Sequence, residues 1–360
     1  MSSRSAAPRH LAGASASVPV ASFVSGALVV LAALALALAL AACGQRSADP
    51  AGPLVVYSGR NEAMIAPLVE RFRAAHGVAV EVRYGETAQL AALLLEEGAR
   101  TPADVFLSQD AGALGALARA GRLAALPQAV LDRVPDPRFR SPDGRWVGTS
   151  GRARVLAYDT RALTPAELPT SVRALTEPAW KGRVGWAPTN ASFQGFVTAF
   201  RLLEGDDAAA AWLRAMKANQ PRVYKNNLAI VEALARGEIA VGLVNHYYVH
   251  AAAKGRSEPL PVANHHFAKD DPGALINVAG IGVLAGSARP AKAQAFIEFL
   301  LGAEAQRHVA DETHEYPLVP GAPPPAGLRP IAEVGSPTID LSRLDALQDT
   351  VRLLQREGIL

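Results

Sequence analysis

Two adjacent tyrosines, Tyr247 and Tyr248, stand in the stretch Gly242–His250, which reads GLVNHYYVH. A phenolate oxygen is a hard anionic ligand that suits a hard trivalent cation, whereas imidazole and thiolate suit softer ions. Free tyrosine titrates near pH ~10, so two neighbouring phenolates need a strong local positive charge, such as that of ferric iron, to stay ionised. The alternative is simple packing, because paired tyrosines are common as half-buried amphipathic residues.

The elements that would position these phenols begin directly after a polar linker. Apolar runs that predict strands alternate with amphipathic runs that predict helices, at 53–59, 61–77, 78–85, 87–100, 103–110 and 111–121. Strands separated by helices form a parallel, doubly wound sheet, and ligands bind beyond the carboxyl ends of its strands. In this chain those ends read YSGRN, RYGET and LSQD.

A second set of strands and helices starts near residue 143. The run 237–250 predicts a strand that enters a cleft with the tyrosines at its carboxyl end. The run 273–309 predicts a strand, a turn and an amphipathic helix that return the chain to the first lobe. We therefore expect an α/β fold of two lobes, with the ligand cleft between them and hinge segments near residues 150 and 275.

The N-terminus has a different composition from the rest of the chain. Arg4 and Arg9 precede an apolar run that ends in Leu40-Ala41-Ala42-Cys43, which predicts an export signal. The last four residues resemble the lipobox of bacterial lipoproteins, in which cleavage precedes a cysteine that receives the lipids. The alternative is a transmembrane anchor, since the run is nearly long enough to span a bilayer. The polar GQRSADPAG that follows is a poor stop-transfer sequence.

The composition limits the classes of partner. Cys43 is the single cysteine, so the exported part has no disulfide and must be held together by core packing. Its length of about 310 residues fits two domains better than one. Removal of 1–42 takes away two arginines and no acids, which leaves 34 basic against 33 acidic side chains, a net charge of +1. That charge disfavours nucleic acid as a partner.

Seven separate parts of the chain resemble the ferric-binding proteins that serve bacterial ABC iron importers. In order they are VVYSGRNE, QLAALLLEEG with TPADVFLSQDAGAL, SGRARVLAYD, PAWKGRVGWAPTNASF, NHYYVHAAAKG, DPGALINVAGIGVL, and AQAFIEFLLGAEAQ with EYPL. They run from about residue 54 to 318. The resemblance implies a two-lobed periplasmic-binding-protein type II fold, each lobe a doubly wound sheet, and a binding protein without catalytic activity. The expected parts are the signal peptide 1–42, a linker 43–52, lobe 1 at 53–150 plus 275–312, and lobe 2 at 151–274 plus 313–360.

The resemblance also assigns residues to an iron site. Tyr247 and Tyr248 correspond to the family's two iron-binding tyrosines, and Asn245 to an asparagine that helps to hold the accompanying anion. The family's usual histidine falls where this chain has Arg60-Asn61-Glu62, and its usual glutamate falls at Gln109. Amides are weak ligands for ferric iron but adequate hydrogen-bond partners, so we expect Asn61 and Gln109 to orient water or an anion. Glu315-Tyr316-Pro317 resembles a structural element of the family.

Because the usual histidine and glutamate are missing, we expect an anion such as carbonate or bicarbonate to complete the iron site. Two phenolates and a carbonate outweigh the charge of Fe3+, and guanidinium groups could offset the excess. Arg60, Arg152 and Arg154 are the candidates, because an arginine fork matches a planar oxyanion. Each of them could equally be a surface arginine in a loop. Thr189, Asn190, Ala191 and Ser192 precede a helix expected near Phe193 and would add hydroxyl and backbone N–H groups.

Further candidate ligands lie near the predicted strand ends and in lobe 2. Tyr57 and Tyr84 lie at the ends of the first two strands and are candidates for a third phenolate. The histidines in or near lobe 2 have ordinary structural explanations and are weaker candidates; they are His246, His250, His265 and His266.

These features favour a lipid-anchored, monomeric solute receptor on the periplasmic or cell-surface face of a membrane. It would capture ferric iron with a synergistic anion and deliver it to an ABC permease and its ATPase. The nearest rival is a receptor of the same fold for phosphonate, sulfate, thiamine or a polyamine. An envelope metalloenzyme is disfavoured, because the chain has no His-Glu-x-x-His, Gly-x-Ser-x-Gly or comparable constellation.

The lipobox makes a direct prediction about Cys43. Labelled palmitate should appear on the expressed precursor and should be absent from the Cys43→Ser variant, since that thiol is the expected site of lipid attachment. A wild-type precursor that carries no label, yet stays in the membrane through an uncleaved segment, would restore the transmembrane alternative.

Overall fold

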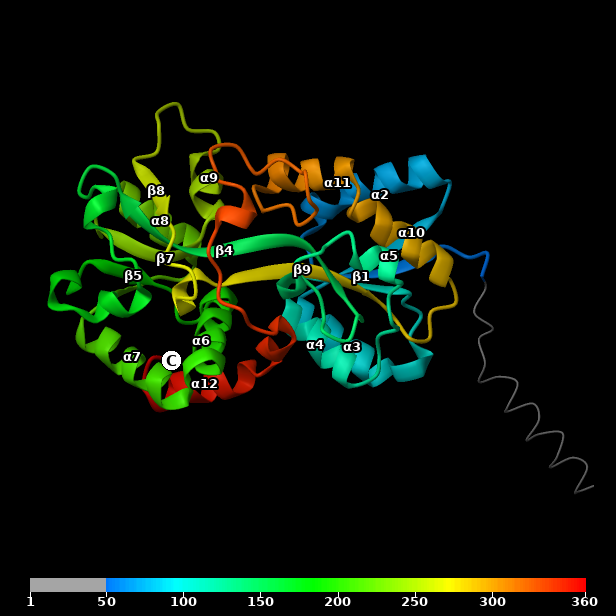
Figure 1. The fold of residues 1–360 in the computed structure, drawn as a ribbon, viewed down its shortest axis with the longest axis horizontal. Helices are drawn as coiled ribbons and strands as arrows, with labels where there is room; N and C mark the ends of the chain where they lie inside the picture. The colour runs from blue at the N-terminus through cyan, green and yellow to red at the C-terminus, as the bar shows by residue number, and fades with distance from the viewer. Residues whose placement is uncertain (1–49) are drawn as a thin grey trace, which may run out of the picture. The chain divides into compact units, whose positions relative to one another are not determined.

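Strands and helices alternate along residues 50–360, which are the residues that a computed structural model describes (Figure 1). The strands are β1 Leu54–Ser58, β2 Val80–Tyr84, β3 Val105–Ser108, β4 Val147–Asp159, β5 Val184–Trp186, β6 Arg222–Val223, β7 Val241–Asn245, β8 Val262–His265 and β9 Ile276–Val283. The helices are α2 Glu62–His76, α3 Thr87–Glu97, α4 Ala111–Arg119, α5 Gln128–Leu131, α6 Ala191–Glu204, α7 Asp206–Ala218, α8 Asn227–Ala235, α9 Tyr247–Ala253, α10 Pro290–Leu300, α11 Ala303–His308 and α12 Leu347–Arg356. The predicted signal peptide and Cys43 lie outside this range.

The strands follow the order β2-β1-β3-β9-β4-β7-β5-β6, with β8 on an edge of β4. The parallel pairing predicted for the first three strands is confirmed, since β1 pairs in parallel with β2 and β3. Strand β4 joins two regions of sheet, because 147–153 pairs with β9 whereas 154–158 pairs with β7. Figure 1 shows α2, α10 and α11 on one face of the β1 region and α3 and α4 on the other.

Local sequence signals explain where the helices begin. The Asn61 side chain caps α2 by accepting a hydrogen bond from the Ala63 N–H, and the predicted apolar stripe of that helix is buried. Helix α6 begins at Ala191, slightly before the position expected from the sequence. The reason is that the Asn190 side chain accepts from the Ser192 N–H and so caps the helix there.

The tyrosine pair lies on a helix rather than on the strand that the sequence predicted through residue 250. Strand β7 ends at Asn245, and the backbone of His246 is already helical, with φ −55° and ψ −38°. Tyr247 therefore opens α9. Successive residues on a strand point to opposite faces, whereas these two phenols share the first turn of a helix.

The C-terminal segment connects two parts of the fold. The short 3₁₀ helix η9, Leu341–Asp345, packs on α4 so closely that a Cβ atom on Gly115 would lie 2.2 Å from the carbonyl oxygen of Ser342. Helix α12 then packs against α6, and the hydroxyls of Thr198 and Thr350 are 2.7 Å apart. In Figure 1 this red segment runs from α4 to α6 and α7.

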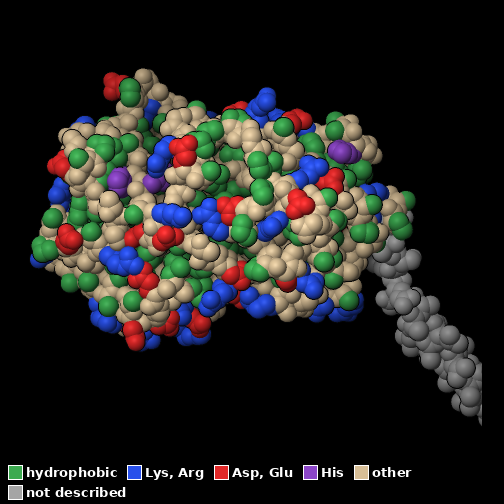
Figure 2. Space-filling view, viewed as in Figure 1, with side chains coloured by type: hydrophobic (Ala, Val, Ile, Leu, Met, Phe, Trp, Pro, Cys, Tyr) green, Lys and Arg blue, Asp and Glu red, His purple; other side chains and the backbone are tan. Residues whose placement is uncertain are grey.

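Within residues 50–360 no helix is both long enough and apolar enough to cross a membrane. Acidic and basic side chains are intermingled over the face drawn in Figure 2.

Candidate metal and anion site

The rings of Tyr247 and Tyr248 lie together on the first turn of α9, with centroids 4.4 Å apart and planes 30° apart. Burial raises the pKa of the Tyr247 phenol well above its ordinary value, and the neighbouring Tyr248 raises it further. Arg152 acts in the opposite direction. Because the Tyr247 phenol resists ionisation by itself, a bound cation is the group that would stabilise its phenolate here.

His246 fixes the backbone turn that places the tyrosines. Its Nδ1 accepts a hydrogen bond from the Ala153 N–H at 3.1 Å, and its Nε2 donates to the His314 carbonyl at 2.9 Å. Burial lowers the pKa of His246 to about 4, so the ring is neutral at physiological pH. Both ring nitrogens are thus used in holding the backbone, which excludes the ring as a metal ligand in this conformation.

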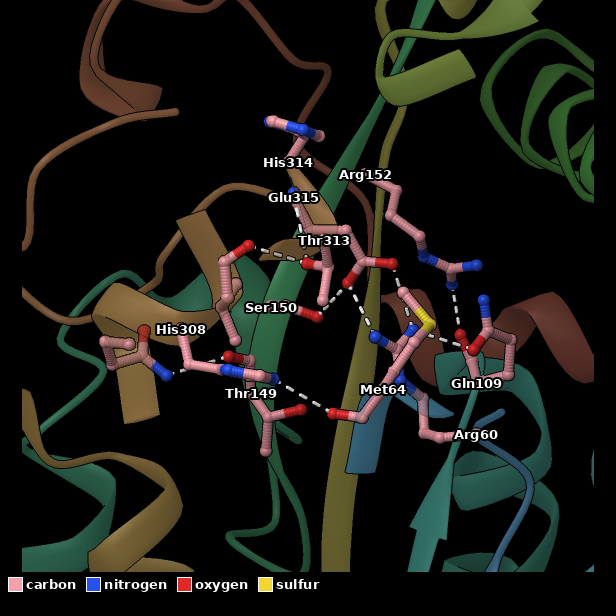
Figure 3. A network of polar contacts seen from close by, with 12 residues as sticks. Arg60, Met64, Gln109, Thr149, Ser150, Arg152, His308, Thr313, His314 and Glu315 are labelled. Carbon is pink, nitrogen blue, oxygen red and sulfur yellow. Dashed lines mark hydrogen bonds and ion pairs between the residues drawn. The ribbon is translucent and has the colours of Figure 1, made fainter. Parts of the chain in front are cut away.

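Arg60 and Glu315 form a buried ion pair (Figure 3), and the charge of Glu315 acts on Tyr247. The guanidinium donates from both terminal nitrogens to the two carboxylate oxygens, each at 3.0 Å. Its NH1 also donates to Gln109 Oε1 at 2.7 Å, and the Ser150 hydroxyl donates to the same carboxylate. This arrangement commits Arg60, one of the predicted anion-binding residues, to contacts within the protein.

Glu315 belongs to this site although the sequence indicated only a structural role for it. Burial alone would oppose its ionisation, but the charges of Arg60 and Arg152 hold the pKa of this carboxyl below its ordinary value. Its negative charge in turn raises the pKa of Tyr247. The Arg152 side chain donates to the backbone carbonyl of Gln109, so Gln109 is held from two sides.

A second cluster surrounds Arg154. Its NH1 donates to Ser192 Oγ at 3.2 Å and lies 3.4 Å from Asn245 Oδ1, and its NH2 donates to the Leu243 carbonyl at 2.9 Å. Burial lowers the pKa of Arg154 to about 9, whereas ionised Tyr247 and Tyr248 would raise it. The cation in this cluster is therefore stabilised by the phenolates that iron would create.

Asn227 completes that cluster, and the sequence analysis missed it. Its Oδ1 accepts from the Asn245 N–H at 3.0 Å and from Arg154, while its Nδ2 donates to Asn190 Oδ1 at 2.9 Å and to Ser192 Oγ at 3.1 Å. The available sequence signal was Asn226-Asn227 at a helix start, a pattern that usually indicates capping alone.

Between these clusters lies a cavity of about 110 Å³. Its walls come from β4, β9, the first turns of α6, the end of β3 and the C-terminal segment, and the lining residues are Gln109, Asp110, Arg152, Arg154, Ala191, Ser192, Gly195, Asn245, Leu275, Asn277, Leu344 and Leu347. The Nε atoms of Arg152 and Arg154 are buried and have no hydrogen-bond partner among residues 50–360. Unpaired buried cationic donors favour an anion. Thr189 is exposed and lies outside this lining.

The two candidates for a third phenolate face other groups. The Tyr57 hydroxyl lies 3.1 Å from Glu97 of α3 and 3.4 Å from Arg83 of β2. Burial raises the pKa of Tyr84, and the charges that act on it are those of Glu62, Arg73 and Glu70. Asn61 is exposed at the start of α2, where its side chain caps the helix. In this conformation none of the three is brought to the tyrosine pair.

The remaining predicted histidines are dispersed. The His250 ring stacks on that of His314 with centroids 4.7 Å apart, and His265 Nε2 lies 3.1 Å from the Pro169 carbonyl. His266 lines a different cavity with Arg138 and Arg329. Within residues 50–360 no group of three or more His, Cys, Asp or Glu side chains could hold a metal ion.

The buried ion pair predicts a large effect of Glu315→Gln on stability. Loss of the carboxylate leaves Arg60 buried without a countercharge, so the free energy of unfolding should fall by about 3–5 kcal/mol. The matched control is Arg60→Met combined with Glu315→Met, which removes both charges and should recover most of that loss. Urea unfolding at neutral pH measures both, and equal destabilisation of the two variants would contradict the prediction.

The same pair predicts a pH dependence for the parent protein. Because the pKa of Glu315 is lower in the folded chain than the ordinary value of about 4.3, its stabilisation is present above that pH. It is lost as the pH falls through the folded-state pKa. The parent should therefore lose more stability than Glu315→Gln when the pH is lowered from about 5 to 3.

Comparison with known proteins identifies the family. A model for the bacterial extracellular solute-binding proteins matches residues 100–330. The Fe(3+)-binding periplasmic protein of Serratia marcescens is 33% identical over 321 residues, which cover 89% of this chain and 94% of that protein. The major ferric iron-binding protein of Neisseria meningitidis is 35% identical over 326 residues, covering 89% and 98%.

Solved structures agree with these relatives. Iron-bound HitA from Pseudomonas aeruginosa superposes with a TM-score of 0.76 at 35% identity, covering 85% of this chain and 99% of that one. A Trichodesmium protein in complex with iron and citrate has the same TM-score and coverage at 29% identity. The predicted type II periplasmic-binding-protein fold is thereby confirmed. The chain belongs to the bacterial extracellular solute-binding proteins, and within them to the ferric-iron-binding group.

Proposed function

We propose that this protein is the receptor of an ABC importer and captures ferric iron together with a small oxyanion. The observation that carries the proposal is the pair of adjacent phenols on α9, on which the buried guanidinium groups of Arg152 and Arg154 act. The relatives are periplasmic iron-binding proteins and not enzymes, which supports a role in transport. A lipid on Cys43 would hold the receptor at the periplasmic or cell-surface face, as a monomer that delivers iron to the permease and its ATPase.

The charges support iron and an anion as one cargo. Two phenolates and a carbonate exceed the charge of Fe3+ by one unit, and the cavity offers two guanidinium groups against the carboxylate of Asp110. At the strand ends of the first lobe, Asn61 and Gln109 stand where the resemblance to the family implies imidazole and carboxylate. Coordination positions on that side would therefore be filled by oxyanion or water oxygen.

The connecting strands support capture by closure of two lobes. We assign lobe 1 to 53–150 with 275–312 and lobe 2 to 151–274 with 313–360. Strands β4 and β9 pair through 147–153 and would act as the hinge, with Ser150 and Leu275 close to the bending points. Opening against the permease would separate the tyrosines from the strand ends of lobe 1 and release the ion.

The second candidate is a receptor of the same fold for a simple or organic anion, such as sulfate or a phosphonate, without iron. The cationic lining of the cavity is the observation that favours it. A receptor for such an anion alone has no use for paired phenols. Colour separates the two functions, because phenolate bound to ferric iron has a visible charge-transfer band.

Phenylalanine in place of the tyrosines tests the iron site. Tyr247→Phe or Tyr248→Phe should abolish the charge-transfer band and weaken ferric binding by orders of magnitude, because each removes an anionic ligand. Tyr57→Phe is the matched control, since that hydroxyl contacts Glu97, and it should keep the colour. Visible spectra of the iron-loaded proteins measure the effect. A double Tyr247→Phe, Tyr248→Phe variant that stays coloured would refute the proposal.

Dependence on the anion tests the second part of the cargo. Iron titrated into protein freed of bicarbonate should bind weakly, and bicarbonate should restore tight binding. Arg152→Ala should lower the affinity measured with bicarbonate by about 1.5–3 kcal/mol, or roughly one to two decades, through loss of a charge-assisted contact. Arg352→Ala, an exposed arginine on α12, is the control and should change little. Tight, coloured binding with no oxyanion present would show that protein side chains complete the shell.

A further inference from the structure

The cavity lined by Arg152 and Arg154 has one wall that comes from the C-terminal segment. Leu344, in η9, and Leu347, at the start of α12, line it together with the charged residues of β4. Leu344 is buried and Leu347 is half-buried. The cavity thus combines cationic donors with an apolar boundary. That boundary limits the size of a bound anion and offers the anion no hydrogen bond.

The C-terminal segment is held firmly at both ends of this wall. On the α4 side, the Trp146 Nε1–H donates to Ser342 Oγ at 3.1 Å, and Arg119 pairs with Asp345. On the α6 side, Arg201 NH1 donates to Thr350 Oγ1 at 2.9 Å. A larger ligand could displace this wall only by breaking these contacts.

Volume and charge both favour a small anion. The cavity of about 110 Å³ has room for a few molecules the size of water, each of which takes ~30 Å³ in the liquid. The charged lining consists of Arg152, Arg154 and the carboxylate of Asp110, so it is positive by one unit. A tricarboxylate such as citrate, which the Trichodesmium protein holds with iron, would exceed this space and meet a like charge at Asp110.

We propose that Leu344 and Leu347 determine anion specificity by closing the cavity to anions larger than carbonate or phosphate. The inference rests on the proposed function, since it concerns the anion that accompanies iron. It assigns to the C-terminal segment a role in selection beside its role in packing.

Variants that widen or narrow the cavity test this inference. Leu347→Ala should raise the affinity for iron measured with citrate about tenfold relative to that measured with bicarbonate, because it removes the apolar boundary. Gly195→Ala should lower the affinity measured with citrate relative to that measured with bicarbonate. A Cβ at Gly195 has Asn277 Nδ2 at 4.0 Å as its nearest neighbour and would enter the cavity, while alanine favours the helix. The charge-transfer band, followed during iron titrations with each anion, gives both affinities.

Leu353→Ala is the control for loss of packing, because Leu353 is buried on the same helix but does not line the cavity. It should lower the melting temperature and leave the citrate-to-bicarbonate ratio unchanged. A wild-type protein that prefers citrate, or Leu347→Ala and Gly195→Ala variants with the wild-type ratio, would overturn the inference while ferric binding stands. A wild-type protein that forms no coloured complex with any anion would instead overturn the proposed function.

Discussion

The buried ion pair between Arg60 and Glu315 ties together the segments from which the site is built. Arg60 follows β1, its guanidinium also holds Gln109 after β3, and Glu315 accepts a hydrogen bond from Ser150 in β4. Neither charge could remain in this environment alone, because an unpaired buried ion costs several kcal/mol. Each side chain therefore requires the other, and the segments that carry them must meet.

This pair changes what the first lobe can offer to a metal. At the ends of β1 and β3, the Arg60 guanidinium is paired with Glu315, and the Gln109 amide is held by Arg60. The anionic oxygen available to a cation then comes mainly from Tyr247 and Tyr248. In the proposed site, Arg152 and Arg154, whose Nε atoms are buried, would balance the charge when an oxyanion joins the metal.

Much of the fold could be predicted because its signals are local. In α2, for example, the apolar residues recur with the helical period, and the cap at Asn61 lies directly before the first turn. The prediction failed at His246, where the apolar run gave no sign that the strand stops. The turn there is held because the His246 ring accepts a hydrogen bond from the Ala153 N–H and donates one to the His314 carbonyl, 93 and 68 residues away.

The sequence by itself determined which ligand types are present: two adjacent phenols, an asparagine before them, and amides or arginine where other ligands were expected. Chemistry of that kind is fixed by residue identity. Only the tertiary structure decided how the groups are used, because Arg60 meets Glu315 across 255 residues and no local pattern encodes that contact. It likewise decided that Asn227 supports Arg154, that Tyr57 turns to Glu97, and that leucines of the C-terminal segment bound the cavity. Such contacts arise when distant segments pack around a common core, so they cannot be predicted from the spacing of residues along the chain.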